Sequence, residues 1–346
     1  SKNTRIIYMT EGVFIRQIQK DPELSNVAAV IFDEFHERHL DTDLSLALAL
    51  EAQSVLRPDL RLIVMSATLD VLPVRKLMPD AAFHEAEASP FPIESIYIPP
   101  VKNQRVELQV AATALRALEE QQGSVLAFLP GQAEIRRCVD ALIGCVDDHA
   151  VDIRPLYGGL SAAEQDAAIA PARVEKRKIV LATNIAQTSL TIEGVSTVID
   201  CGLDRRPKYD PKTGLTSLAT ERVSQAAAEQ RKGRAGRLGP GVCYRLWEKA
   251  QTRSFPPYDP PEILNCDLAP MAMHLSAWGV SSPDSLSWLD NPPQASFEQA
   301  QSLLKGLQVL GSDGALTGLG KSIVALPLHP RLGVMLMRAS ELGQLR

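Results

Sequence analysis

The sequence predicts an α/β protein built on parallel β-sheets, and three observations support this fold class. Short apolar runs rich in β-branched residues alternate with longer segments of helical periodicity, which is the pattern of a parallel sheet flanked by helices. Most of these runs end in small or polar residues, and ligands of open α/β sheets bind outside the carboxyl ends of the strands. A length of 346 residues with 45% apolar content suffices for two or three domains.

Six apolar runs are expected to form strands, at residues 27–32, 60–65, 125–129, 179–182, 195–199 and 242–246. A proline-punctuated stretch, residues 89–100, separates the first two runs from the others and indicates a linker between two α/β domains. Helical patterns at 264–278 and 297–310 follow a second proline-rich break, and the turn-rich segment 311–320 suits a small hairpin. This last region has the outline of a winged-helix module.

The composition limits the classes of protein to consider. Five cysteines occur without CxxC pairing or ligand spacing, so neither a disulfide framework nor a zinc site is expected. No apolar run approaches the roughly 18 residues of a membrane span, and residues 1–5 lack the apolar segment of a signal peptide. We therefore expect a cytoplasmic protein without a membrane partner.

The charge of the chain is unevenly distributed. Its net value of −5 does not by itself indicate a nucleic-acid partner. Residues 173–249, however, hold fifteen Lys and Arg against eight Asp and Glu, a net of +7 that leaves −12 for the remainder. This basic region suits a nucleic-acid strand, although chance clustering on a solvated face is an equally good interpretation. Candidates for contacting a strand include Lys176, Arg177, Lys178, Arg205 and Arg206.

Two adjacent carboxylates, Asp33 and Glu34, follow the first apolar run. At a strand end they could hold Mg²⁺, which takes one or two carboxylates together with phosphate oxygens, and Glu34 could orient or deprotonate a water. An acidic cap of the next helix is the plainer interpretation. A metallohydrolase site is disfavoured, because the H-E-x-H spacing does not place two imidazoles on one helical face. Its candidate ligands would be His36, Glu37, His39, Asp41 and Asp43.

Two further segments carry polar residues suited to phosphates. In residues 230–237, Arg234 and Arg237 lie three positions apart and would share one face of a helix, from which a guanidinium could stabilise a transferring phosphoryl group. In residues 183–192, Thr183, Asn184 and further hydroxyls follow an apolar run and could hold a nucleic-acid backbone without reading bases. The plainer interpretations are a surface pair of arginines and an ordinary N-capping loop.

A third segment, Gly320-Lys321-Ser322, looks like the end of a phosphate-binding P-loop. The motif G-x-x-x-x-G-K-[ST] would need a glycine at Ala315, so these residues do not complete it. We assign them to the expected hairpin of the winged-helix module. The 346 residues then contain no P-loop.

In their order and spacing these segments resemble the motifs of the DEAH-box branch of superfamily 2 helicases, here with DEFH as a variant of the signature. The resemblance covers essentially the whole chain. It assigns residues 10–12 to motif Ib, 33–36 to motif II, 66–68 to motif III, 128–131 to motif IV, 183–192 to motif V and 230–237 to motif VI.

The resemblance implies a fold and an activity. The expected fold has two RecA-like parallel-sheet domains, the first one truncated, followed by a winged-helix domain and the start of a helical ratchet domain. The expected boundaries are 1–95, 96–260, 261–330 and 331–346. The implied activity is unwinding of single-stranded or duplex nucleic acid, RNA rather than DNA, driven by hydrolysis of ATP or another NTP with Mg²⁺.

The resemblance also implies roles for single residues. Asp33 and Glu34 would hold Mg²⁺, Glu34 would activate water, and Gln230 would position that water. Arg234 and Arg237 would contact the phosphates, and the remaining nucleotide-binding residues would be Ser189, Thr191 and Glu193. Nucleic-acid contacts would come from Thr10, Gly12, Thr183, Asn184 and Thr188. Hydrolysis would be coupled to domain movement by His36, Ser66 and Thr68.

The sequence departs from the family pattern in two places. Gln187 stands where the family usually has Glu in motif V, which removes a charge. Motifs I and Ia do not occur in the 346 residues, so we expect a fragment of a longer protein that hydrolyses no nucleotide by itself. A non-catalytic nucleic-acid-binding module is the main alternative, and a protein-interaction scaffold is disfavoured by the basic region.

Overall fold

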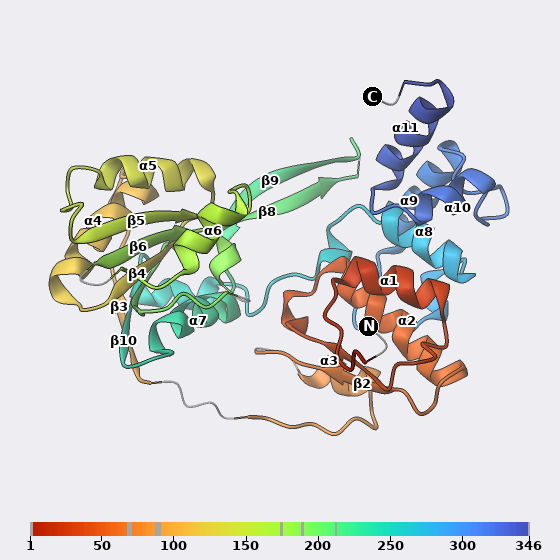
Figure 1. Ribbon diagram of the computed structural model, residues 1–346, viewed down its shortest axis with the longest axis horizontal. Coiled ribbons are helices and arrows are strands. Elements are labelled where there is room, and N and C mark those ends of the chain that lie inside the picture. Colours follow the sequence, from red (N-terminus) through yellow and green to blue (C-terminus); the bar gives the residue numbers. More distant parts are fainter. Residues whose placement is uncertain are drawn as a thin grey trace. The chain divides into compact units, whose positions relative to one another are not determined.

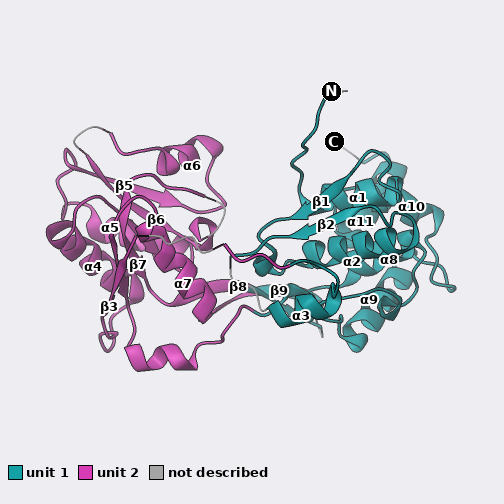
Figure 2. Cartoon of the chain, turned by 90° about the horizontal axis from the view of Figure 1, so that it is seen from below, with its two compact units in different colours: residues 1–82, 207–217, 260–346 teal, residues 83–206, 218–259 magenta. Residues whose placement is uncertain are grey.

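The computed structural model describes residues 3–67, 71–86, 91–173, 176–187, 190–211 and 213–344. The chain divides into two compact units (Figure 2). Unit 1 comprises Ser1–Ala82, Pro207–Ser217 and Pro260–Arg346, and unit 2 comprises Phe83–Arg206 and Leu218–Asp259. Within the described ranges, no helix is long and apolar enough to cross a membrane.

The described part of unit 2 contains a six-stranded, entirely parallel sheet in the order β3-β10-β7-β4-β6-β5 (Figure 1). The strands are β3 (Ile93–Tyr97), β4 (Ser124–Phe128), β5 (Val151–Leu156), β6 (Arg177–Ala182), β7 (Val195–Asp200) and β10 (Gly241–Arg245). The helices are α4 (Val106–Glu120), α5 (Gln132–Leu142), α6 (Ala162–Ile169) and α7 (Gln225–Gly233). The fold class predicted from the sequence is confirmed.

Both faces of this sheet are buried, as a parallel sheet requires. Every residue of β4 is buried, and alternate side chains point to opposite faces. Val125 and Ala127 join a core that contains residues of α4 and α5, whereas Leu126 and Phe128 join the core that contains Ala168 of α6. The continuous apolar runs of the sequence therefore mark strands that are covered on both sides.

The proline-punctuated stretch 89–100 is only partly a linker. Residues 93–97 form strand β3, which pairs in parallel with β10, so the interpretation of the whole stretch as a connection is wrong. The pattern IESIY is short and bounded by prolines, and β3 is an edge strand, where nearby prolines are tolerated. Its first residues, Ser89 and Pro90, lie outside the described residues.

Unit 1 combines a parallel strand pair with two groups of helices. The pair is β1 (Ala29–Phe32) and β2 (Arg61–Val64), and the first helices are α1 (Glu11–Lys20), α2 (Leu40–Val55) and α3 (Val71–Leu77). The second group is α8 (Ala269–Trp278), α9 (Gln294–Gly306), α10 (Gly318–Val324) and α11 (Pro330–Glu341).

Helices from both ends of the chain share one hydrophobic core in unit 1. Ile15 and Leu48 of the first group lie in the same buried cluster as Leu275 and Phe297 of the second. Residues 1–82 and 260–346 therefore fold against each other, although about 180 residues separate them in the sequence. The four domain boundaries given above stay predictions.

The expected hairpin at 311–320 is almost absent from the structure. A single antiparallel bridge joins Leu310 and Leu316, and Gly320-Lys321-Ser322 lie within α10. Their assignment to a hairpin is wrong, because the Thr317 hydroxyl accepts a hydrogen bond from the Gly320 amide at 3.0 Å and thereby caps a helix. The predicted helices 264–278 and 297–310 correspond to α8 and α9 with shifted ends.

The remaining elements are one pair of strands and several short 3₁₀ helices. A hairpin of β8 (Leu203–Asp210) and β9 (Leu215–Arg222) was not expected from the sequence. The 3₁₀ helices are η1 (Phe35–Glu37), η2 (Asn184–Ala186), η3 (Arg234–Gly236), η4 (Lys249–Ser254), η5 (Glu262–Leu264) and η6 (Pro283–Ser285).

Candidate functional site

The carboxylates Asp33 and Glu34 lie in unit 1, at the carboxyl end of β1. Glu34 adopts a left-handed backbone conformation, with φ of 50°, which turns the chain sharply out of the strand. The Asp33 carboxylate accepts a hydrogen bond from the Glu34 amide at 2.8 Å. Asp33 is exposed and Glu34 is half-buried, so both offer oxygen atoms of the kind that a hard cation prefers.

His36 connects this carboxylate loop to the segment after β2. The Nδ1 atom of His36 accepts from the Ala67 amide at 3.4 Å, and its Nε2 atom lies 3.4 Å from the Glu34 carboxylate. Because a backbone amide can only donate, Nδ1 is the acceptor and Nε2 carries the proton that faces Glu34. The ring is 6% exposed.

Two of the three predicted coupling residues are thus near each other, since Ser66 directly precedes Ala67. The Ser66 hydroxyl is buried in this structure. The third residue, Thr68, lies outside the described residues.

Arg38 and His39, which sequence reasoning gave no structural role, fix the loop to the C-terminal part of unit 1. Arg38 binds Asp43 with two hydrogen bonds of 3.1 and 3.0 Å and Asp290 with one of 2.7 Å. The two ring nitrogens of His39 lie 3.1 Å from Glu262 and 2.8 Å from Glu37. Hydrogen bonds to Glu262 and then Glu37 raise the pKa of His39 to about 10.

These ion pairs also bear on the metallohydrolase interpretation. His36 faces Glu34 and the Ala67 amide, whereas His39 faces Glu37 and Glu262, so the two imidazoles do not converge on one point. The Asp43 carboxylate forms an ion pair with Arg38. The residues after Glu34 stabilise the packing of the loop rather than surround a metal.

Thr10 and Gly12, the predicted nucleic-acid residues of unit 1, stand at the start of α1. The carbonyl of Thr10 accepts from the amides of Val13 and Phe14 at 3.0 Å each, while its side chain makes no capping hydrogen bond. Thr10 is exposed and Gly12 is half-buried. An exposed hydroxyl at a helix start is compatible with a phosphate contact.

In unit 2, the loop after β6 forms one hydrogen-bonded network with the end of α7 and the residues that follow it. Thr183 and Asn184 leave the strand, and Gln187 receives hydrogen bonds from the other segment. Arg237 donates to the Thr191 hydroxyl. Thr191 and Glu193 are exposed, whereas the predicted residues Thr188 and Ser189 lie outside the described residues.

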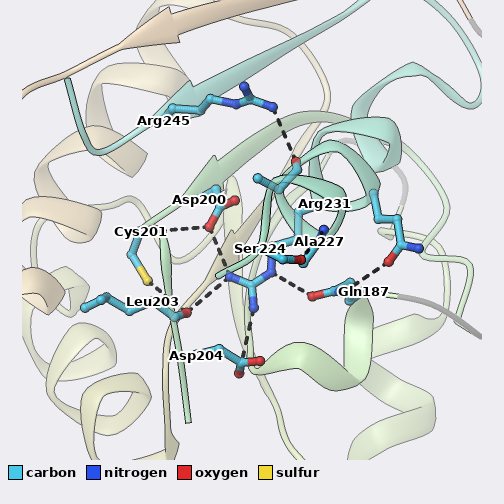
Figure 3. Close-up of polar contacts among 12 residues, drawn as sticks. Gln187, Asp200, Cys201, Leu203, Asp204, Ser224, Ala227, Arg231 and Arg245 are labelled. Atoms are coloured by element: carbon cyan, nitrogen blue, oxygen red, sulfur yellow. Dashed lines mark hydrogen bonds and ion pairs between the residues drawn. The ribbon is translucent and has the colours of Figure 1, made fainter. Parts of the chain in front are cut away.

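Arg231 lies at the centre of this network (Figure 3) and is 1% exposed. Its guanidinium donates to Asp200 at 3.0 Å, to the Leu203 carbonyl at 3.2 Å and to the side-chain oxygen of Gln187 at 2.9 Å. It also lies 4.9 Å from the ring centroid of Phe128. One buried arginine therefore joins the segments assigned to motifs IV, V and VI.

Arg234 and Arg237 lie in different environments, although the sequence suggested that they share one face of a helix. Helix α7 ends at Gly233, and Arg234 begins the turn η3. Arg234 is 9% exposed and donates to the carbonyls of Gln187, at 2.9 and 2.5 Å, and Leu190, at 2.6 Å. Arg237 is exposed. Arg234 therefore binds the backbone of the loop after β6, whereas the Arg237 side chain is exposed at the surface of unit 2.

Several basic residues of region 173–249 serve the interior of unit 2. Lys178 is buried and donates to the carbonyls of Ala167, Ala168 and Ala170 at the end of α6. Arg177 donates to the carbonyl of Leu118, in the last turn of α4, and to that of Gly123, after the helix. Lys176, Arg205 and Arg206 likewise bind protein groups, namely Asp148, Glu134 and Asp259. The proposal of Arg177 and Lys178 as strand contacts is wrong, because charge counts do not reveal which cations cap buried helix ends.

Comparison with known proteins shows that this chain is similar to helicases. Residues 108–239 match the family described as "Helicase conserved C-terminal domain". "ATP-dependent RNA helicase HrpB" of Escherichia coli is 47% identical over 98% of this chain and 42% of its own length, and "Probable ATP-dependent RNA helicase DHX34" of Mus musculus is 37% identical over 98% and 31%.

Solved structures agree with the sequence comparison. The chain in "Crystal structure of Escherichia coli DEAH/RHA helicase HrpB" matches with a TM-score of 0.89 and 47% identity, over 97% of this chain and 43% of that one. The present chain therefore spans about two fifths or less of the length of these relatives. By sequence and by fold, the chain is similar to part of the DEAH/RHA helicase HrpB, and its residues 108–239 match the helicase conserved C-terminal domain.

Proposed function

We propose that this chain is a part of an ATP-dependent RNA helicase that contributes residues to nucleotide hydrolysis and contacts RNA. The observation that carries the proposal is the network around Arg231, which ties Gln187 and Gln230 of two motifs into one rigid group. A motor must transmit small changes at a phosphate through such contacts. The relatives named ATP-dependent RNA helicases support ATP and RNA as the ligands.

The chemistry divides between the two units. Asp33 and Glu34 offer carboxylate oxygens suited to Mg²⁺, which when bound neutralises charge on the phosphates. Glu34 would accept a proton from the attacking water, with the protonated Nε2 of His36 beside it. Arg237, exposed on unit 2, would stabilise charge on the transferring phosphoryl group. Arg234 would act by holding the backbone carbonyls of Gln187 and Leu190 in place.

The nucleic-acid part of the proposal rests on exposed hydroxyl and amide groups. Thr10 in unit 1 and Asn184 in unit 2 are exposed, and such groups bind the sugar-phosphate backbone without reading sequence. The helical segment 261–330 would act as a winged-helix module. A cytoplasmic location is part of the proposal, since all five cysteines are unpaired, as in a reducing compartment.

The test of this function uses the longer helicase polypeptide that contains these residues. Glu34→Gln should leave ATP binding intact and reduce hydrolysis to the background rate, because the amide cannot take a proton from water. Glu23→Gln, which changes the same charge at an exposed position in unit 1, is the matched control and should hydrolyse ATP normally.

Wild-type hydrolysis by Glu34→Gln would contradict the assignment. The 346 residues alone should hydrolyse no NTP, since they hold no G-x-x-x-x-G-K-[ST] loop for the phosphates. If the longer protein binds RNA but never hydrolyses nucleotide, a non-catalytic nucleic-acid-binding module is the better description.

A further inference from the structure

The loop after β1 contains two residues in an uncommon backbone conformation. Glu34 and Arg38 both lie in the left-handed region, with φ of 50° and 51°. Residues other than glycine keep this conformation where the surrounding contacts fix it. The first half of the loop has such contacts, because the Phe35 amide donates to the Met65 carbonyl at 3.0 Å and the Phe35 side chain is buried. The second half, residues 38–40, requires contacts of its own.

Glu262 supplies the backbone contacts of this second half. Its amide donates to the Arg38 carbonyl at 3.0 Å. One oxygen of its carboxylate accepts from the Leu40 amide at 2.9 Å, and the other lies 3.1 Å from the Nδ1 atom of His39. One residue therefore binds three consecutive loop residues, although it lies 222 positions beyond Leu40 in the sequence.

The contact between Glu262 and Leu40 caps helix α2. Leu40 is the first residue of this helix, and the N-cap residue His39 makes no capping hydrogen bond with its side chain. The Glu262 carboxylate takes that place, where an amide needs an acceptor and a negative charge is favourable. Burial raises the pKa of Glu262, but its hydrogen bonds with His39 and the Leu40 amide lower it by more, so the carboxylate is ionised at neutral pH. Glu262 thus determines where the loop ends and the helix begins.

Glu262 is itself firmly placed in unit 1. It begins η5, and the next residue, Ile263, is fully buried in the core cluster that also contains residues of α2. The side chain of Arg38 gives the loop a separate attachment through Asp43 and Asp290. Loss of the Glu262 carboxylate should therefore loosen the loop without unfolding it.

We propose that Glu262 is a positioning residue for nucleotide hydrolysis, which holds the end of the loop and thereby keeps Glu34 and His36 in their mutual arrangement. The inference rests on the proposed function, in which Glu34 accepts a proton from the attacking water. The His36 ring lies 3.4 Å from the Glu34 carboxylate and 3.4 Å from the Ala67 amide, so a shift of residues 35–38 would change both contacts. A general base acts only within hydrogen-bonding reach of its water, and a small displacement lowers the rate.

The first experiment measures the loop in this 346-residue chain by hydrogen exchange, resolved at single amides by NMR. In Glu262→Ala the Leu40 amide loses its acceptor and should exchange roughly 10-fold faster. The Glu37 amide donates to the Glu34 carbonyl at 2.9 Å and reports on the turn that carries the general base. It should also exchange faster. Faster exchange at Leu40 alone, with Glu37 unchanged, would overturn the inference.

Thr317→Ala is the matched control, because it also removes a helix cap from unit 1. The Thr317 hydroxyl accepts from the Gly320 amide at 3.0 Å, at the start of α10. This variant should lower the melting temperature of unit 1 about as much as Glu262→Ala, yet leave the exchange of Leu40 and Glu37 unchanged. Equally fast exchange of these two amides in both variants would show a general loss of stability and refute the positioning role.

The second experiment measures ATP hydrolysis by the longer polypeptide, at a temperature where all variants are folded. Glu262→Ala should lower kcat on the order of 10-fold with little change in KM for ATP, because the base is displaced while the nucleotide still binds. Glu262→Gln keeps an oxygen for the Leu40 amide and should restore most of kcat, and Thr317→Ala should keep all of it.

Two kinetic results would contradict the positioning role of Glu262. One is a wild-type kcat in Glu262→Ala, and the other is an equal loss of kcat in the alanine and glutamine variants. If the wild type hydrolyses no ATP, the proposed function fails, while the exchange result still decides whether Glu262 holds the loop.

Discussion

Replacement of Arg231 by alanine should destabilise unit 2 severely. The side chain is 1% exposed, and its partner Asp200 is fully buried. In Arg231→Ala, Asp200 keeps the Gly202 amide at 2.9 Å but loses its countercharge. The Gln187 oxygen and the Leu203 carbonyl lose a donor in the same step.

The expected magnitude follows from these contacts. Removing one partner of a buried ion pair costs about 3–5 kcal/mol, because the remaining charge stays desolvated. For a unit of this size, about 2–4 °C of melting temperature correspond to each kcal/mol, so a decrease of roughly 6–20 °C is expected. Arg116→Ala removes an exposed pair with Glu120 and serves as the control, which should change the melting temperature little because solvent screens this pair.

Hydrogen exchange measured by mass spectrometry can report on each unit separately. Peptides from β4 and β7 of unit 2 should exchange roughly 10² to 10³-fold faster in Arg231→Ala, since their protection follows the unfolding free energy. Peptides from α2 of unit 1 should not change. If β4 and β7 exchange no faster than in Arg116→Ala, Arg231 is not the structural centre of the network.

Two further predictions concern charged groups outside the proposed chemistry. The pKa of His39 is raised to about 10, so the folded state binds its proton more tightly than the unfolded state does. Protonated His39 therefore stabilises the folded state fully below about pH 6.5, and this contribution is lost as the pH rises toward 10. His39→Gln should therefore flatten the decrease of the unit 1 melting temperature between pH 6.5 and 10; an unchanged slope would contradict the ion pairs. Lys178→Met should destabilise unit 2 by about 1–3 kcal/mol in urea denaturation, because three carbonyls at the end of α6 lose their donor. Lys249→Met, at an exposed position, is its control, and equal stability of the two variants would refute the capping role.

The sequence predicted the interior of the fold better than its edges. The six predicted strands are confirmed, because each is a continuous apolar run, and four of them form the centre of the unit 2 sheet. The two strands of that sheet that were missed, β3 and β5, are its edges, and the strands of the separate hairpin, β8 and β9, were missed as well. Both edge strands mix polar with apolar residues, prolines flank β3 and β5 contains Pro155, so neither is a continuous apolar run, although an edge tolerates such residues.

The candidate site was predictable where a motif is contiguous in the sequence. Asp33, Glu34 and the residues of motifs V and VI could be named from order and spacing. The contacts of Arg38 with Asp290 and of His39 with Glu262 could not, because their partners lie more than 200 residues away. The sequence also does not show which side chains are buried, and for this reason Lys178 was interpreted as a surface cation.

The central claim is that an exposed arginine of unit 2 acts on nucleotide, and paired measurements on Arg237→Ala test it most directly. Steady-state ATP hydrolysis and a salt titration of RNA binding are recorded with the longer polypeptide. The account predicts a loss of hydrolysis of about 10³-fold with an unchanged salt dependence of binding. Normal hydrolysis, with the salt slope lowered by about one, would show that Arg237 binds the RNA backbone instead and would contradict the account.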